Sequence, residues 1–148
     1  DVSVENPAPG EVAIRPLLKD GKLPDTEVLK QVSDILDARN IRPLTDKVTV
    51  EAPTTVEYDI DLSYWIDRTN AAEAVAIQAA AENAIKDFTE WQSQRLGRDI
   101  NPSRLIRDIV VAGAKRADIT TPEFKVVKPN GIAIAEHINV VYGGLEDG

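Results

Sequence analysis

The sequence contains no cysteine, no methionine and only one histidine among its 148 residues. Without cysteine the chain cannot form a disulfide, a thiolate zinc site or a cysteine nucleophile. A single histidine leaves little metal chemistry to consider. A chain that lacks methionine cannot retain an initiator residue, and we therefore expect a fragment or a processed piece of a longer protein.

Long apolar runs are also missing, and aromatic residues make up only 5% of the chain. No segment approaches the roughly 20 apolar residues that a membrane helix needs, so no membrane partner is expected. The sequence does have 43% apolar and 28% charged residues, with a net charge of -8. This balance is typical of one globular domain that buries roughly 70% of its unfolded surface.

The two ends of the chain differ in composition from the middle. Residues 1–10, DVSVENPAPG, contain Pro7 and Pro9 and end in glycine, which is typical of an extended connector. We expect these residues to be a linker from a missing N-terminal region. A single domain would then span residues 11–142, and the ending GGLEDG (143–148) is expected to be a flexible tail.

The clearest pattern lies between Val56 and Ile66, where apolar and polar residues alternate. This alternation predicts a strand with one buried face and with Glu57, Asp59 and Asp61 on the other. Shorter strands are expected near residues 12–14 and 47–50, within 116–127, and over 131–142. The last two would flank a turn at 129–131.

Helices are expected where apolar residues recur at a spacing of three or four positions. One begins at Asp25, and a longer one, of about 25 residues, begins at a cap formed by Asn70. The expected inward stripes are Val28, Leu29, Val32, Ile35 and Leu36 on the first helix, and Ile77, Ala81, Ala84, Ile85, Phe88 and Trp91 on the second.

The segment QRLGRDINPSRLI (94–106) predicts a corner between two helices. Gly97 suits the left-handed conformation that ends a helix, Asn101 can cap the next helix, and Pro102 fits its first position. The new helix would run to about residue 112. It is expected to bury Leu105, Ile106, Ile109 and Val110 and to leave Val111 facing outward.

Together these elements predict an α+β two-layer sandwich. Their order approximates the ferredoxin-like βαββαβ arrangement, with the second crossover enlarged to a helix pair and an extra C-terminal strand. The helices would cover one face of a single sheet, and the carboxylates of the alternating strand would line the other.

The polar residues of this strand suggest little catalytic chemistry. Glu57, Asp59 and Asp61 could gather a hard cation, but same-face residues lie about 6.8 Å apart along a strand, which favours a solvated sheet face. His137 has no cysteine, second histidine or nearby serine arrangement that would complete a nucleophilic or metal site, and it is expected to be a structural or surface histidine. The glycine pairs match neither GxGxxG nor a P-loop, so no enzyme, cofactor or metal site is expected.

Arginine is concentrated in one segment. Between Arg95 and Arg116 there are six basic residues and two acidic ones, a net charge of +4 within a chain of net charge -8. A contact with an acidic partner surface is favoured here, and a solvated helix corner is the simpler alternative. Trp65, on the polar side of its strand, would either anchor a contact or pack at an edge. The candidate partner-contact residues are Arg95, Arg98, Arg104, Arg107, Arg116, Trp65 and Val111.

Four stretches of the sequence carry a family resemblance: RPLTDKVTVEAP (42–53), YDIDLSYWI (58–66), WQSQRLGRDINPSRLI (91–106) and VVYGGLEDG (140–148). They resemble the C-terminal part of the baseplate J-like family, the baseplate wedge proteins of contractile-tailed phages and related particles. The resemblance covers the chain from about Gly10 onward. Members of the family typically carry a further N-terminal region, which this sequence does not include.

The resemblance implies a structural, non-enzymatic protein of the virion tail baseplate, assembled in the bacterial host cytoplasm. Its partners would be other baseplate and tail proteins, and it would form a homo-oligomer in the assembled particle. Two alternatives remain open on the residues alone. One is a nucleic-acid-binding module that uses the basic corner 95–116, which the acidic balance of the chain disfavours. The other is an accessory domain that binds carbohydrate or metal.

Overall fold

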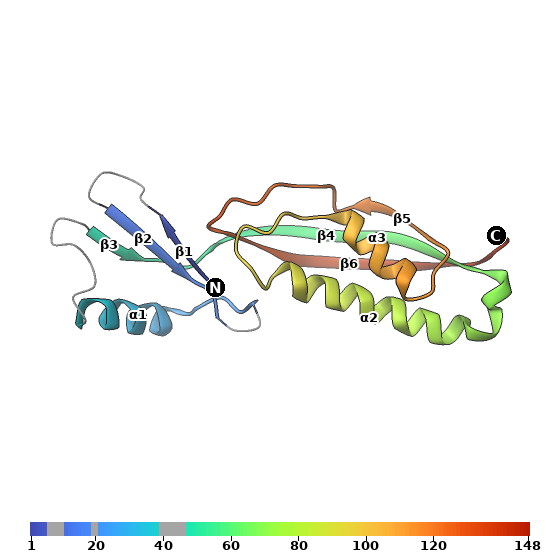
Figure 1. The fold of residues 1–148 in the computed structure, drawn as a ribbon, viewed down its shortest axis with the longest axis horizontal. Helices are drawn as coiled ribbons and strands as arrows, with labels where there is room; N and C mark the ends of the chain where they lie inside the picture. Colours follow the sequence, from blue (N-terminus) through green and yellow to red (C-terminus); the bar gives the residue numbers. More distant parts are fainter. Residues whose placement is uncertain (6–10, 19–20, 39–46) are drawn as a thin grey trace.

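The computed structural model describes residues 1–5, 11–18, 21–38 and 47–148. Within these ranges it contains two separate three-stranded sheets, one at each end of an elongated molecule (Figure 1). The α+β class is therefore confirmed. The single ferredoxin-like sheet is wrong, because the strands expected in one sheet divide between two. None of the helices described is long and apolar enough to cross a membrane.

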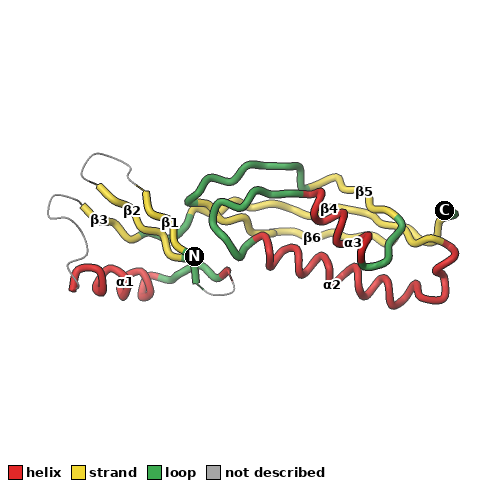
Figure 2. The backbone as a smooth tube through the Cα atoms, viewed as in Figure 1, coloured by secondary structure: helices red, strands yellow, loops and turns green. Residues whose placement is uncertain are grey.

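The first sheet has the order β1-β2-β3 and is built from three short strands. These are β1 (Val2–Glu5), β2 (Glu11–Pro16) and β3 (Lys47–Val50). β1 pairs antiparallel with β2, whereas β3 pairs parallel with β2. Parallel neighbours need a crossover, and α1 (Thr26–Ala38) lies in that connection, beside the sheet (Figure 2).

The second sheet has the order β5-β4-β6, with the longest strands of the described chain at its centre and one edge. Its strands are β4 (Thr54–Asp67), β5 (Arg116–Thr121) and β6 (Gly131–Glu146). β4 is antiparallel to β5 and parallel to β6. The crossover between β4 and β6 contains the 3-10 helix η2 (Arg68–Glu73), α2 (Ala74–Gln92), α3 (Pro102–Val111) and β5 itself.

The division into two sheets follows from strand length. β3 has four residues and is followed by Pro53, whose nitrogen cannot donate to a ladder. β4 has 14 residues and finds a partner of similar length in β6, with which it pairs from Thr54 and Gly131 to Asp67 and Glu146 across two shifts in register. The chain therefore leaves the first sheet at β3 and starts a new one.

Both expected irregular ends contain regular structure. The linker expected over residues 1–10 instead contains β1, while residues 6–10 lie outside the described part. The flexible tail expected from residue 143 is replaced by the end of β6, which continues to Glu146. Gly143 is needed there for close packing rather than for flexibility, because a Cβ atom at this position would overlap the indole of Trp65.

The core of the second sheet confirms the alternating pattern of β4. Tyr58, Ile60, Leu62, Tyr64 and Ile66 are all buried, and the carboxylates between them are exposed. The stripe of α2 packs on this face as expected, led by Ala81, Ile85 and Phe88. α3 completes the cover with Leu105 and Ile109. Of the first helix's stripe, Val28, Leu29 and Val32 are half-buried, and the side chains of residues 35–40 lie outside the described part.

The helix boundaries confirm some of the expected caps and correct others. Asn101 accepts a hydrogen bond from the backbone N–H of Ser103, and Pro102 opens α3 as predicted. Gly97 has a positive φ of 69°, although α2 already ends at Gln92. The cap expected at Asn70 is wrong. Asp67 caps η2 instead, by accepting the Thr69 N–H, and α2 starts later.

α3 buries a narrower stripe than its sequence suggests. Leu105 and Ile109 are fully buried, but Ile106 is 37% and Val110 42% exposed, which corrects the prediction that both lie in the core. A ten-residue helix resting on α2 and β5 buries one row of residues four apart, and the adjacent row points about 100° away. Val111 is 77% exposed, as predicted.

We expect Ile109→Ala to lower the free energy of unfolding by about 2–5 kcal/mol, because it opens a cavity in the core. Val111→Ala, on the same helix, should change it by less than about 0.5 kcal/mol. Urea denaturation followed by circular dichroism measures both values. Equal losses in the two variants would contradict the assigned orientation of α3.

Candidate partner-contact surface

The first arginine cluster surrounds Trp91, in the last turn of α2. The guanidinium carbon of Arg98 lies 4.2 Å from the centre of the indole ring, and that of Arg104, from α3, lies 3.9 Å away. Both distances fit cation–π contacts. Arg98 also donates a hydrogen bond to the Trp91 carbonyl. Two of the predicted contact arginines therefore hold α2 and α3 together.

Burial is the main cause of the lowered pKa of Arg98, and the charges of Arg95 and Arg104 add to it. The guanidinium group still carries its charge at neutral pH, because arginine side chains are not deprotonated in proteins. This crowding of like charge is compatible with folding because Trp91 offers its electron-rich ring face to two of the three guanidinium groups.

The turn between α2 and α3 is fixed by a buried amide that the sequence reasoning missed. Gln92 is fully buried, and its Nε2 donates to the carbonyl oxygens of Arg98 at 3.0 Å and Asp99 at 2.9 Å. The Asp99 carboxylate in turn accepts the backbone N–H of Val127 at 3.0 Å. Spacing could have revealed Gln92, since it follows Ala81, Ile85 and Phe88 on the same inward stripe.

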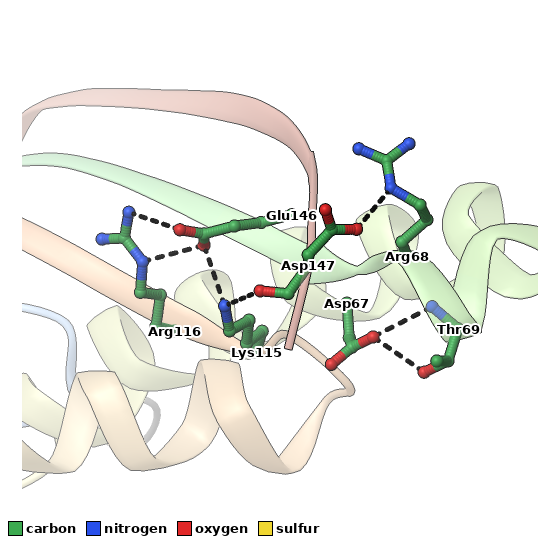
Figure 3. Close-up of polar contacts among 7 residues, drawn as sticks. All are labelled: Asp67, Arg68, Thr69, Lys115, Arg116, Glu146 and Asp147. Atoms are coloured by element: carbon green, nitrogen blue, oxygen red, sulfur yellow. Dashed lines mark hydrogen bonds and ion pairs between the residues drawn. The ribbon is translucent and has the colours of Figure 1, made fainter.

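A second cluster gathers at the end of the second sheet (Figure 3). Arg116 stacks 3.7 Å from the ring centre of Trp65 and donates to both Glu146 oxygens, at 2.9 and 3.3 Å. Lys115 lies 3.5 Å from Glu146 and donates to the Asp147 carbonyl at 2.6 Å. Trp65 is thus half-buried between Arg116 and Gly143, and both predicted contact residues are engaged within the chain.

The same region contains two carboxyl groups with lowered pKa values. The hydrogen bonds from Arg116 lower the pKa of Glu146. The pKa of Asp67 is lowered because its carboxylate accepts the backbone N–H and the hydroxyl of Thr69, at 2.9 and 2.8 Å. Arg68 donates to the Asp147 carboxylate at 2.7 Å. The contacts of Arg116 and Arg68 hold the C-terminal end of β6 and the residue after it against β5 and η2.

The remaining predicted contact residues lie on the outer side of α3 and the turn before it. Arg107 has a side chain that is 67% exposed, and its only close carboxylate among the described residues is the adjacent Asp108, at 3.6 Å. Arg95 is exposed. Val111 lies near the exposed Ile106 and Val110 on the same helix. We call Ile106, Arg107, Val110 and Val111 the α3 outer face.

The uncovered face of the second sheet is acidic and exposed. His137 approaches Asp59, with its ring Nδ1 at 3.2 Å from one carboxylate oxygen, and Asn139 donates to Asp61 at 3.1 Å. A hydrogen bond with Glu136, followed by its charge, raises the pKa of Glu57. One potential metal-ligand atom from each of Asp59, Glu136 and His137 lies within 4.8 Å of the other two, and all three residues are exposed. This arrangement fits a solvated sheet face.

Comparison with known proteins divides the chain in the same way as its sheets. Residues 58–141 match the model of the baseplate J-like protein C-terminal domain, and residues 1–52 match that of the baseplate J-like central domain. Baseplate protein J of Escherichia phage P2 is 29% identical over 149 residues, which cover 99% of this chain and 48% of that protein. The chain therefore spans about half the length of this relative.

Two carboxyl groups near opposite ends of the second sheet should have pKa values shifted in opposite directions. We expect Glu146 to titrate below the ordinary glutamate pKa and Glu57 above it. Carbon-detected NMR titration of the side-chain carboxyls measures both. Arg116→Gln should raise the pKa of Glu146 toward its ordinary value and leave that of Glu57 unchanged. Glu136→Gln should lower the pKa of Glu57 toward its ordinary value and leave that of Glu146 unchanged.

The stability effect follows from the sign of the Glu146 shift. A carboxyl group with a lowered folded-state pKa stabilises the fold above its unfolded pKa, and this contribution is lost as the pH falls through the folded value. In the Arg116→Gln variant, the free energy of unfolding should therefore fall less as the pH is lowered. An unchanged Glu146 titration in this variant would contradict the contact drawn in Figure 3.

Proposed function

Because the chain belongs to the baseplate J-like family, we propose that it is a structural part of a phage tail baseplate wedge that joins neighbouring subunits by protein–protein contacts. The observation that carries this proposal is the consecutive match of both family domains, central then C-terminal, along one chain. The protein would act without catalysis, within the virion, after assembly in the host cytoplasm. Its partners would be other baseplate and tail proteins and further copies of itself.

The α3 outer face is the surface we assign to one of these contacts. It combines three exposed apolar side chains with an exposed arginine, and arginine beside apolar groups is typical of protein interfaces. Arg95, in the turn before α3, is also exposed, and its positive charge would favour an acidic surface on the neighbour. Arg98, Arg104, Arg116 and Trp65 would contribute indirectly, since they fix the helices and strands that carry this face.

We expect the pair Arg107→Glu and Val111→Asp to weaken assembly, because it reverses a charge and places a carboxylate in the apolar patch. The complete protein would be co-expressed with the neighbouring tail proteins, purified through one of them, and imaged for wedges or rings. The amount of protein retained should fall at least about tenfold, as expected when an interface loses about 1.4 kcal/mol.

Val4→Asp is a matched control, because Val4 is 65% exposed on β1 of the other sheet. It should leave retention unchanged. Thermal unfolding of each variant separates a lost contact from a lost fold. Full retention of the double variant would remove the α3 outer face from the interface. No association of the unmodified protein with any tail protein would contradict the proposed function itself.

A further inference from the structure

The outer edge of β6 has no strand beside it in the described part of the chain. β6 is the terminal strand of the second sheet, has 16 residues, and pairs only with β4 among these residues (Figure 2). Residues 136–139 are exposed, as are Val141 and Gly143. Such an edge presents unpaired backbone N–H and C=O groups, and proteins usually shorten, bend or cover it.

Irregular pairing with β4 makes only part of the β6 edge unsuitable for an added strand. Its register with β4 shifts between Tyr58 and Ile60 and again between Tyr64 and Ile66. Between these shifts, Ile138 to Tyr142 pair regularly with Ile60 to Tyr64. This five-residue stretch keeps the geometry that an added strand requires.

Ile138 is left exposed at the position where the side chain of a further strand would pack. Its register partner Ile60 is 1% exposed, so both side chains belong to the face covered by α2, yet Ile138 is 52% exposed. Beside it lies a hollow of about 370 Å³ that opens between α2 and β6. The residues lining this hollow are Glu82, Ile85, Lys86, Thr89, Ile138 and Val140.

A second hollow of about 220 Å³ continues the first, because Thr89 and Ile138 line both. It reaches Ile134 and Ala135 at the other side of the register shift. The two hollows form one groove along the edge, which we call the β6 groove. Its lining combines the apolar residues of β6 and Ile85 with polar and charged residues of α2 and the position after it, namely Glu82, Lys86, Thr89, Glu90 and Ser93. Alternate side chains of an added strand would point into it, as inward side chains do in any sheet on a helix layer.

The intervening side chains of the same strand would lie over the opposite, acidic face. Glu136 is exposed there on β6 itself, and the exposed Asp59 and Asp61, on the neighbouring strand β4, contact His137 and Asn139 of β6. Glu57 and Glu136 interact closely enough to raise the pKa of Glu57, so negative charge is concentrated at this position. Basic side chains would relieve that repulsion.

We propose that β6 accepts an extended segment of another protein as a fourth strand, with apolar side chains in the β6 groove alternating with basic side chains over the acidic face. Backbone hydrogen bonds along Ile138 to Tyr142 provide the binding energy, and the groove and the carboxylates select the sequence. This site is separate from the α3 outer face, and its test does not depend on baseplate assembly.

The probe is a synthetic heptapeptide, KVKVKVK, added to the isotopically labelled chain. Binding should protect amides of residues 138–142 from hydrogen exchange and shift their NMR signals. The peptide EVEVEVE is the charge control, and KVKPKVK, which lacks one backbone donor, is the strand control. Both should bind at least about tenfold more weakly.

Two neighbouring variants distinguish the two faces of β6. Ile138→Asp should weaken KVKVKVK binding by about tenfold or more, because it places a charge in the groove. Val141→Asp changes a side chain of similar exposure, 48%, on the acidic face, and should leave binding unchanged or tighten it. Asp59→Asn should weaken binding and reduce its salt dependence.

Three results would overturn the proposal. One is the absence of protection at residues 138–142 at millimolar peptide. Another is equally tight binding of EVEVEVE, which would show that the site does not select basic side chains. The third is self-association of the chain through β6 in place of peptide binding, detected by sedimentation and relieved by Ile138→Asp, which would make a second copy the occupant. None of these results bears on co-purification with tail proteins, so the two proposals fail separately.

Discussion

The pairing of β4 with β6 is the interaction on which the rest of the second sheet depends. It joins two strands in parallel over 14 residues of β4 and positions the alternating buried side chains against α2 and α3. A parallel pair cannot be closed by a tight turn, so the connection must cross over the sheet. The helix pair, the arginine-rich turn and β5 are all parts of that crossover, and their positions follow from it.

The parts of this fold that are predictable from sequence are those with a local physical cause. The alternation of β4 directly reports one buried face, and the Asn101–Pro102 start of α3 satisfies free N–H groups within one turn. The number of sheets has no such local cause, because alternation does not identify which strand pairs with which. The match in length between β4 and β6 appears only when residues far apart are compared.

The candidate surface shows the same limit at the level of single side chains. Counting charges between Arg95 and Arg116 located a basic segment, but a guanidinium group can reach several partners. Arg98 and Arg104 contact Trp91, and Arg116 contacts Trp65 and Glu146. Which residues form the α3 outer face depends on which apolar side chains of this short helix are covered by other elements. Val111 was predictable from its position, whereas Ile106 and Val110 were not.

The order of elements also has a consequence for how the chain reaches its native state. β4 is synthesised before the crossover, and its parallel partner β6 is synthesised only after it. Until then the helices can cover the apolar face of β4, but β4 lacks its longest set of strand hydrogen bonds, the pairing with β6. Contacts between such distant segments slow folding, since a large loop must close before they form. Synthesis of β6 thus sets the earliest moment at which all three strands of this sheet can pair.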